Sequence, residues 1–260
     1  MEKILKPDFS GILSFPEKQD ACVICCHGIR SDKNEWGNFT KLSEKLQENG
    51  ISCYRFDFTG HGESSRDFSE FCISEGIKDL EKAIEYVEKL GYQKIVVLGA
   101  SFGAGIAGLA DYGKYPTVDS LVLWYPVLVY SDAELFSREN VEKAVKDGFL
   151  KTQSIHSGKI YSFCKKLMLE TLRYCPYEKI LELDMPKLLV HGKKDTVTPC
   201  GRTEELAKKS KNARMLLIEN GTHGFFDKEE HLHKVIDDTI NYIKEVFHES
   251  CVNSDGFDRK

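Results

Sequence analysis

The chain has 260 residues, of which 41% are apolar and 30% are charged, a balance that is ordinary for a globular protein. No stretch approaches the roughly 18 uninterrupted apolar residues of a membrane-spanning helix, so no membrane span is expected. The net charge of -5 comes from scattered residues of both signs, which makes a nucleic-acid partner unexpected as well. Residues 1–8 are charged and interrupted by Pro7, so they lack the apolar core of a secretory signal peptide, and we expect a cytoplasmic protein.

The cysteines favour a reduced protein without a metal site. They number nine, which is odd, and Cys22, Cys25, Cys26 and Cys53 lie in apolar runs that are typical of buried strands. Cys22 and Cys25 match half of a zinc or redox motif, but strand residues three apart point to opposite faces of a sheet, and no second pair follows nearby. We therefore predict core thiols and no bound metal.

Short apolar runs along the chain predict the strands of a parallel sheet. They lie at residues 21–26, 52–58, 94–98, 120–125, 187–191 and 213–219. Segments with apolar residues at helical spacing separate most of them, at residues 39–46, 77–90, 102–112, 201–210 and 232–243. Because strands and helices alternate through most of the chain, we predict an α/β fold with a mostly parallel sheet of about eight strands and helices on both faces.

Residues 127–183 interrupt this alternation. The segment is too long for a simple connection and has helical stretches around residues 134–149 and 162–174, so we predict a helical cap inserted into the fold. The core then comprises residues 1–126 and 184–249, and residues 250–260 form a frayed tail. The sequence does not define the oligomeric state, and a homodimer is compatible with it.

The strongest functional motif is the pentapeptide GASFG at residues 99–103, which follows one predicted strand and begins the next helix. A G-x-S-x-G turn in this position is strained, needs small flanking residues and raises the serine hydroxyl above the sheet beside a helix N-terminus. A hydroxyl is a poor nucleophile at neutral pH and needs a base within hydrogen-bond reach. Ser101 is therefore the candidate nucleophile.

Candidates for the base and its acidic partner follow the last two predicted strands. Asp195 lies in the loop after residues 187–191, and His223 lies in the loop after residues 213–219. Both loops leave the carboxyl ends of strands, where open α/β sheets place their sites. Taken singly, Asp195 could be a turn cap and His223 a solvated loop histidine. Together, and in the order Ser, Asp, His, they predict a triad in which Asp195 orients His223 as the general base for Ser101.

Two backbone amides are candidates for an oxyanion hole. Acyl transfer needs donors to the tetrahedral oxyanion, and removing one commonly costs about 3 kcal/mol of transition-state stabilisation. We predict the amide of Phe102, directly after the nucleophile, and that of Ile29, in the HGI sequence at residues 27–29. The HGI sequence could also be a tight turn without this role.

A second glycine pattern competes with this interpretation. Residues 103–108, GAGIAG, match the G-x-G-x-x-G fingerprint of dinucleotide sites near a strand-to-helix junction. Such a site expects an acidic residue about 20 positions further on, at the end of the following strand, whereas residues 124–126 here are WYP. We therefore interpret the glycines as contacts of a closely packed helix and predict no cofactor.

Taken together, these motifs resemble the α/β-hydrolase superfamily over residues 27–247. The run RFDFTGHGES at residues 55–64, with GKKD at residues 192–195, is similar to bacterial cinnamoyl and feruloyl esterases and to related serine aminopeptidase-like, acylglycerol lipase-like hydrolases. The resemblance implies cofactor-independent cleavage of small carboxylic esters and a cap that shapes the acyl pocket. Ala100 and Phe102 depart from it, because many of these esterases have histidine and several have glutamine at those positions, which leaves the choice of substrate open.

Further candidates for substrate binding are less specific. Asp57 resembles a position close to the site in those esterases, although a turn cap before Gly60 explains it equally well. Tyr125, which ends a predicted strand, and Tyr161, in the insertion, are added as candidates. Aromatic residues of the insertion either line an acyl pocket or belong to the core, and they are Phe136, Phe149, Tyr161, Phe163 and Tyr174.

We therefore expect a serine hydrolase that cleaves a small-molecule carboxylic ester through an acyl-enzyme intermediate. Thioesters or small amides are alternative substrates within the same class. A protein that keeps the fold, binds a small ligand and does not hydrolyse it is the alternative outside this class.

Overall fold

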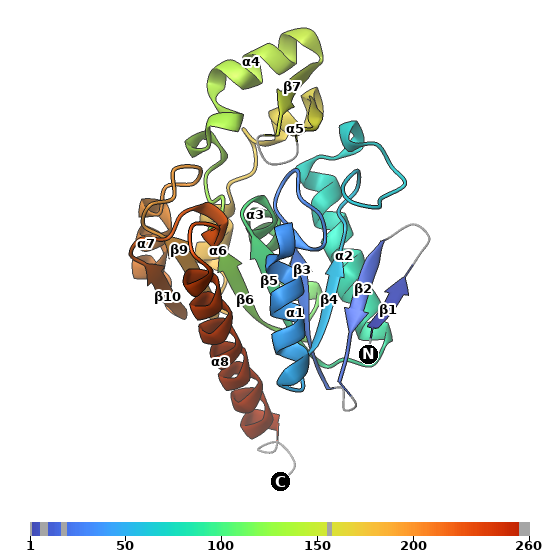
Figure 1. Ribbon diagram of the computed structural model, residues 1–260, viewed down its shortest axis with the longest axis vertical. Coiled ribbons are helices and arrows are strands. Elements are labelled where there is room, and N and C mark those ends of the chain that lie inside the picture. The colour runs from blue at the N-terminus through green and yellow to red at the C-terminus, as the bar shows by residue number, and fades with distance from the viewer. Residues whose placement is uncertain (1, 6–9, 17–19, 155–157, 255–260) are drawn as a thin grey trace.

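The computed structural model describes residues 2–5, 10–16, 20–154 and 158–254 (Figure 1). An eight-stranded sheet with strand order β1-β2-β4-β3-β5-β6-β9-β10 runs through its centre. Its strands are β1 (Glu2–Leu5), β2 (Gly11–Ser14), β3 (Ala21–Cys26), β4 (Ser52–Phe56), β5 (Lys94–Ala100), β6 (Val118–Trp124), β9 (Lys187–Gly192) and β10 (Ala213–Ile218). β1 and β2 are antiparallel to their neighbours and the other strands are parallel, which confirms the predicted α/β class.

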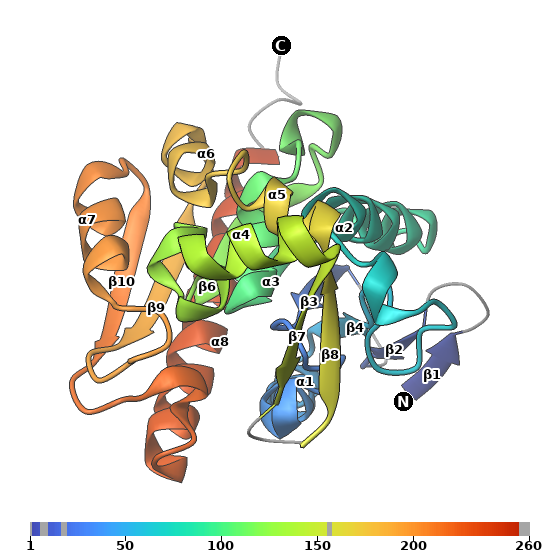
Figure 2. The ribbon, with the colours of Figure 1, turned by 90° about the horizontal axis from the view of Figure 1, so that it is seen from above.

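Helices cover both faces of the sheet (Figure 2). α1 (Asn38–Glu48) and α8 (Glu229–Ser254) pack on one face. The other face is covered by α2 (Ile73–Lys89), α3 (Phe102–Leu109), α6 (Pro176–Glu182) and α7 (Gly201–Lys209). Because the central strands are covered on both sides, β3 and β5 consist almost entirely of buried apolar residues.

The alternation of side chains along β3 separates its cysteines as the sequence predicts. Cys22 packs in the core beneath α2, whereas Cys25 packs in the core beneath α1, so the two thiols lie on opposite faces of the sheet. Cys25 instead lies beside Cys53 of β4, with 3.6 Å between their sulfur atoms. Both thiols are buried and free.

The insertion, residues 127–183, is only partly helical, and most of it lies above the sheet in Figure 1. It contains α4 (Arg138–Asp147), α5 (Lys165–Glu170) and α6, but also the antiparallel pair β7 (Phe149–Gln153) and β8 (Ile160–Cys164). The helical stretches expected around residues 134–149 and 162–174 are therefore only partly correct, because Phe149 and residues 162–164 lie in strands. Gly148, at φ 85°, ends α4, and buried residues then alternate with more exposed ones, which is the period of a strand.

The two ends of the chain also differ from expectation. β1 and β2 were not predicted, because each has only four residues and no long apolar run. The expected frayed tail at 250–260 was wrong for its first part, since α8 continues to Ser254, and residues 255–260 lie outside the described part. Within the described residues, no helix has the length and apolar character needed to cross a membrane.

The glycines of α3 serve close packing, as predicted for the G-x-G-x-x-G sequence. A Cβ atom on Gly103 would lie 2.3 Å from the Cys26 carbonyl oxygen, and one on Gly108 would lie 2.4 Å from the Ile180 side chain. Real Cβ atoms do not approach other atoms so closely, so side chains here would force α3 away from β3 and from α6. The helix that follows Ser101 is thereby held tightly against its neighbours.

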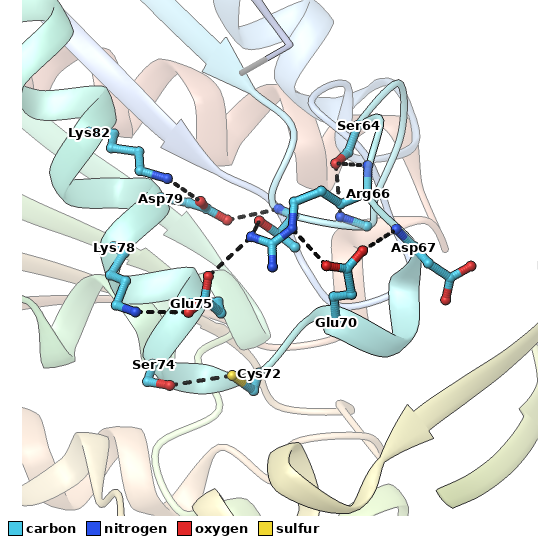
Figure 3. A network of polar contacts seen from close by, with 12 residues as sticks. Ser64, Arg66, Asp67, Glu70, Cys72, Ser74, Glu75, Lys78, Asp79 and Lys82 are labelled. Atoms are coloured by element: carbon cyan, nitrogen blue, oxygen red, sulfur yellow. Dashed lines mark hydrogen bonds and ion pairs between the residues drawn. The ribbon is translucent and has the colours of Figure 1, made fainter. Parts of the chain in front are cut away.

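A network of polar contacts ties the loop after β4 to α2 (Figure 3). The buried Asp79 carboxylate accepts a hydrogen bond from the Thr59 amide at 2.8 Å, and Lys82 lies 3.6 Å from it. Arg66 contacts Glu70 and Glu75, each at 3.1 Å, but these groups are more exposed. The Asp79 contact therefore fixes the loop more strongly than the Arg66 ion pairs do.

We predict that Asp79→Ala lowers the free energy of unfolding by about 1–3 kcal/mol, because it leaves the buried Thr59 amide without an acceptor. Arg66→Ala should cost less than about 1 kcal/mol, since exposed ion pairs contribute little. Urea unfolding measures both, and Asp79→Asn, which keeps an acceptor oxygen, is the control that should stay close to wild type. A larger loss in Arg66→Ala than in Asp79→Ala would contradict this ranking.

Candidate active site

Ser101 lies on the sharp turn between β5 and α3. Its φ is 53°, which is uncommon for a residue with a side chain, and this conformation raises the hydroxyl out of the sheet. The turn requires small neighbours, because a Cβ on Gly99 would lie 2.5 Å from the Ala104 Cα atom. The sequence and the backbone therefore agree on a strained strand-to-helix turn that presents a serine.

His223 and Asp195 meet Ser101 above the ends of three parallel strands. The Ser101 Oγ and the His223 Nε2 are 3.1 Å apart, and the His223 Nδ1 and the Asp195 Oδ2 are 2.7 Å apart. The carboxylate can only accept, so Nδ1 carries the proton and Nε2 accepts the hydrogen bond from the serine hydroxyl. The three predicted residues thus form one continuous chain of hydrogen bonds.

The Asp195 carboxylate is held by several donors at once. The amides of Val197 and Thr198 donate to its Oδ1 at 2.8 and 2.9 Å, and the Thr198 hydroxyl donates to its Oδ2 at 3.0 Å. Burial alone raises the pKa of Asp195, but hydrogen bonds from His191 and His223 outweigh it and leave the pKa below its usual value. Asp195 is therefore ionised at neutral pH and fixed in orientation.

The two predicted oxyanion-hole amides are available beside Ser101. Phe102 is the first residue of α3, and such N-terminal amides have no partner within their helix. Ile29 follows Gly28, whose Cα position is so close to the nucleophile that an added Cβ would lie 3.3 Å from the Ser101 Cβ. Among the described residues, neither amide donates a hydrogen bond to another protein group.

A buried carboxylate, Glu35, lies next to this loop. It accepts a hydrogen bond from the Gly28 amide at 2.8 Å and one from the Tyr125 hydroxyl at 3.3 Å, and it is only 4% exposed. Burial raises the pKa of Glu35 to about 7, although the Gly28 hydrogen bond and His223 oppose the rise. Glu35 thus anchors the turn that carries Ile29 and is easily protonated.

A cavity of about 360 Å³ opens beside the Ser101 hydroxyl. Its walls come from the loop after β3, from the loops that carry Asp195 and His223, and from the insertion. Six described residues other than glycine have a positive φ, and five of them line this cavity: Arg30, Glu35, Trp36, Ser101 and Tyr125. Backbone strain of this kind persists where the surrounding structure enforces it, and it clusters at functional sites.

Three large apolar side chains form part of the rim of the cavity, beside the exposed polar residues Glu134 and Thr196. Trp36, Val197 and Phe226 line it and are 42%, 50% and 48% exposed. Large apolar side chains left open to solvent around a cavity are typical of a surface that contacts an apolar ligand. The cavity therefore combines polar groups near Ser101 with a partly apolar rim.

Comparison with known proteins identifies the family. The family model described as "Serine aminopeptidase, S33" matches residues 17–154, more than half of the chain. The chain belongs to the serine aminopeptidase family. A second model, described as "TAP-like protein", matches residues 159–242. The α/β-hydrolase resemblance that the sequence predicts is confirmed.

Relatives of this serine aminopeptidase family member include proteins named for hydrolase activity. Human "Serine hydrolase BPHL" is 24% identical over 88% of this chain and 79% of its own length. Mouse "Palmitoyl-protein thioesterase ABHD10, mitochondrial" is 26% identical over 79% of this chain and 70% of its own length. The structure of ferulic acid bound to Est1E from Butyrivibrio proteoclasticus superposes with a TM-score of 0.79 at 20% identity, over 92% of this chain and 96% of that one, and shows the shared fold.

Asp57 and Tyr161 were predicted to bind substrate, but neither lines the cavity. Asp57 is buried and accepts hydrogen bonds from the Lys33 amide and ammonium, both at 2.7 Å. The Tyr161 hydroxyl donates to the Arg30 carbonyl at 3.1 Å. Both side chains hold the loop after β3 in place. They therefore support a wall of the cavity without lining the cavity themselves.

The other aromatic candidates divide between the cavity, the core and, for Phe149, the exposed surface. Tyr125 lines the cavity, and its ring lies edge-on to His223 with 4.8 Å between ring centroids. Phe136 also lines it, and Phe149, Phe163 and Tyr174 do not. The Phe102 ring packs in the core, with 5.3 Å between its centroid and that of the Tyr130 ring.

Sequence reasoning missed Glu35, Arg30 and Thr198. No motif marks Glu35, since its contact with Gly28 exists only once the intervening loop folds back. Thr198 lies three residues after Asp195, and this spacing is the only local signal for a residue that caps the carboxylate.

We predict that Glu35→Gln changes how stability depends on pH. The folded-state pKa of Glu35, about 7, is above the usual 4.5, so the folded protein binds this proton more tightly than the unfolded chain does. Its contribution to stability is complete below pH 4.5 and is lost as the pH rises through 7. Relative to Glu35→Gln, the wild type should therefore lose about 2–3 kcal/mol between pH 4.5 and 8, measured by urea unfolding. If the unfolding free energies of the wild type and Glu35→Gln differed by the same amount at pH 4.5 and pH 8, the pKa of Glu35 would not be raised by folding.

Proposed function

We propose that this protein is a serine hydrolase that cleaves small carboxylic esters through an acyl-enzyme intermediate. The observation that carries the proposal is the continuous chain of hydrogen bonds from Ser101 through His223 to Asp195. A serine hydroxyl gains nucleophilicity when a fixed imidazole can take its proton, and the buried carboxylate stabilises the imidazolium that results.

In the first half of the reaction, the Ser101 Oγ attacks the ester carbonyl and its proton passes to the His223 Nε2. The tetrahedral intermediate collapses, the bond to the alcohol oxygen breaks, and His223 returns the proton to the departing alcohol. In the second half, His223 takes a proton from water, which attacks the acyl-enzyme. Collapse then releases the acid and restores the proton to Ser101.

The amides of Ile29 and Phe102 are proposed to stabilise the negative charge on the carbonyl oxygen. Both come from turns that are fixed before substrate arrives: Phe102 by the start of α3, and Ile29 by the contact of Gly28 with Glu35. Donors that are already in position avoid a reorganisation cost when charge develops, which is the main source of oxyanion stabilisation.

The insertion is proposed to act as a cap that shapes the acyl pocket. Val127, Ala133, Leu135 and Phe136 supply apolar lining close to Ser101. A cavity of about 360 Å³ lies at the small end of the range for ligand sites, which favours compact acyl groups.

Acyl thioesters are the second candidate substrates. The apolar rim of Trp36, Val197 and Phe226 could contact a longer chain that extends beyond the cavity. One relative is named as a palmitoyl-protein thioesterase. Thioester cleavage would use the same residues, with a thiol as leaving group in place of the alcohol.

We predict that a fluorophosphonate probe labels the wild-type protein on Ser101 and leaves Ser101→Ala unlabelled. The probe reacts only with a serine activated by its base, so Ser137→Ala, which removes a serine in the insertion outside this cavity, should label like wild type. The same samples should hydrolyse p-nitrophenyl esters in proportion to their labelling. Absence of a Ser101-dependent adduct would favour the alternative of a ligand-binding protein that does not hydrolyse its ligand.

A further inference from the structure

Arg30 occupies a distinctive place in the cavity. It directly follows Ile29, has a φ of 65°, and its carbonyl oxygen accepts the Tyr161 hydrogen bond that links this loop to β8. Its side chain is half-buried and lines the same cavity as the Ser101 hydroxyl. A strained backbone thus places a cationic side chain next to the proposed oxyanion hole.

The Arg30 guanidinium has no protein partner in the described part of the chain. It donates no hydrogen bond and forms no ion pair there. The Arg173 side chain also has none among the described residues, but it is exposed to solvent, whereas Arg55 donates to Asn34 and Arg202 donates to Asp132. A guanidinium has five donors and stays charged, so partial burial without a partner is costly.

Nearby carboxylates do not neutralise this charge. Glu35 accepts from Gly28 and from the Tyr125 hydroxyl instead, and Glu134 is exposed where it lines the cavity. Desolvation lowers the pKa of Arg30, which reflects water lost without a carboxylate to compensate. The cavity therefore contains a half-buried cation that pairs with no carboxylate of the described residues.

We infer that Arg30 binds an anionic group, a carboxylate or a phosphate, on the substrate of this site. The inference rests on the proposed hydrolysis at Ser101 and narrows its substrate class to anionic esters or thioesters. A guanidinium pairs with either anion through two parallel hydrogen bonds, which gives orientation as well as affinity. Because Arg30 is adjacent to Ile29, the anion would be held close to the carbonyl under attack.

The anion could belong to either half of the substrate. On the acyl side it would be a second carboxylate, as in the half-ester of a dicarboxylic acid. On the leaving-group side it would be a phosphate on a short alcohol, as in an acyl ester of glycerol phosphate. Both present the same chemistry to Arg30, and matched pairs of substrates separate them.

The test measures kcat/KM for two matched pairs of substrates. The acyl-side pair is mono-p-nitrophenyl glutarate and neutral p-nitrophenyl valerate. The leaving-group pair is 1-butyrylglycerol 3-phosphate and the neutral ester 1-butyrylglycerol. For at least one pair, Arg30→Gln should lower the ratio of anionic to neutral kcat/KM by about tenfold or more, chiefly through KM. Arg30→Lys should recover part of the ratio, because it restores the charge without the paired hydrogen bonds.

Arg138→Gln is the matched control. It removes the same charge from α4, where the side chain is 92% exposed and paired with Glu142 outside the cavity, so its ratios should equal those of wild type. Unchanged ratios for both pairs in Arg30→Gln would overturn the inference. So would a fall of equal size in Arg30→Gln and Arg138→Gln, which would indicate only a general field effect.

A binding measurement on a variant that cannot hydrolyse the substrate distinguishes failure of the anion-site inference from failure of the proposed hydrolysis. Calorimetry with Ser101→Ala, which cannot form the acyl-enzyme, measures affinity for monomethyl glutarate and for 1-butyrylglycerol 3-phosphate. Adding Arg30→Gln should weaken one of these by about tenfold or more, whether or not the wild type hydrolyses esters. Equal affinities with and without Arg30 for both ligands would refute the anion site even if ester hydrolysis at Ser101 is established.

Discussion

The hydrogen bond between the Asp195 carboxylate and His223 Nδ1 is the interaction on which the rest of the site depends. At 2.7 Å it fixes which imidazole nitrogen carries the proton, and therefore which one faces Ser101. The bond requires an ionised carboxylate in a buried place, which is possible because two amides, the Thr198 hydroxyl and His191 surround it. The loop after β9 thus surrounds the Asp195 carboxylate with hydrogen-bond donors. The parallel sheet places this loop beside those that carry His223 and Ser101.

A second constraint acts on the opposite side of the serine. The loop after β3 carries Ile29 and Arg30, and it is held from three directions: by Glu35 on Gly28, by Asp57 on Lys33, and by Tyr161 on the Arg30 carbonyl. These contacts join the sheet, the loop itself and the insertion at one point. They explain how non-glycine residues in left-handed conformations persist here, since each strained turn is fixed by contacts on both sides.

The sequence identifies the three residues that the structure brings together, because its signals are local. A G-x-S-x-G turn after a strand, and polar residues after two further strands, are enough once parallel strands place their carboxyl ends at one edge. Contacts between residues that are distant along the chain form only on folding, and local sequence patterns do not predict them. The Tyr161 hydroxyl donates a hydrogen bond to a carbonyl 131 positions earlier in the chain. The β7–β8 pair replaces expected helices, because a short amphipathic run becomes a strand only when the fold brings a second run beside it. Asp57 shows the same limit, since its carboxylate accepts hydrogen bonds from Lys33 and does not line the cavity.

The most direct measurement of the central claim is capture of the covalent intermediate. The protein is mixed with a p-nitrophenyl ester, quenched in acid within the first turnovers, and analysed by intact mass and peptide mapping. We expect a mass increase equal to the acyl group, located on the peptide that contains Ser101, because acylation precedes attack by water. Ester hydrolysis with no acyl adduct on Ser101, or an adduct that persists in Ser101→Ala, would contradict the account.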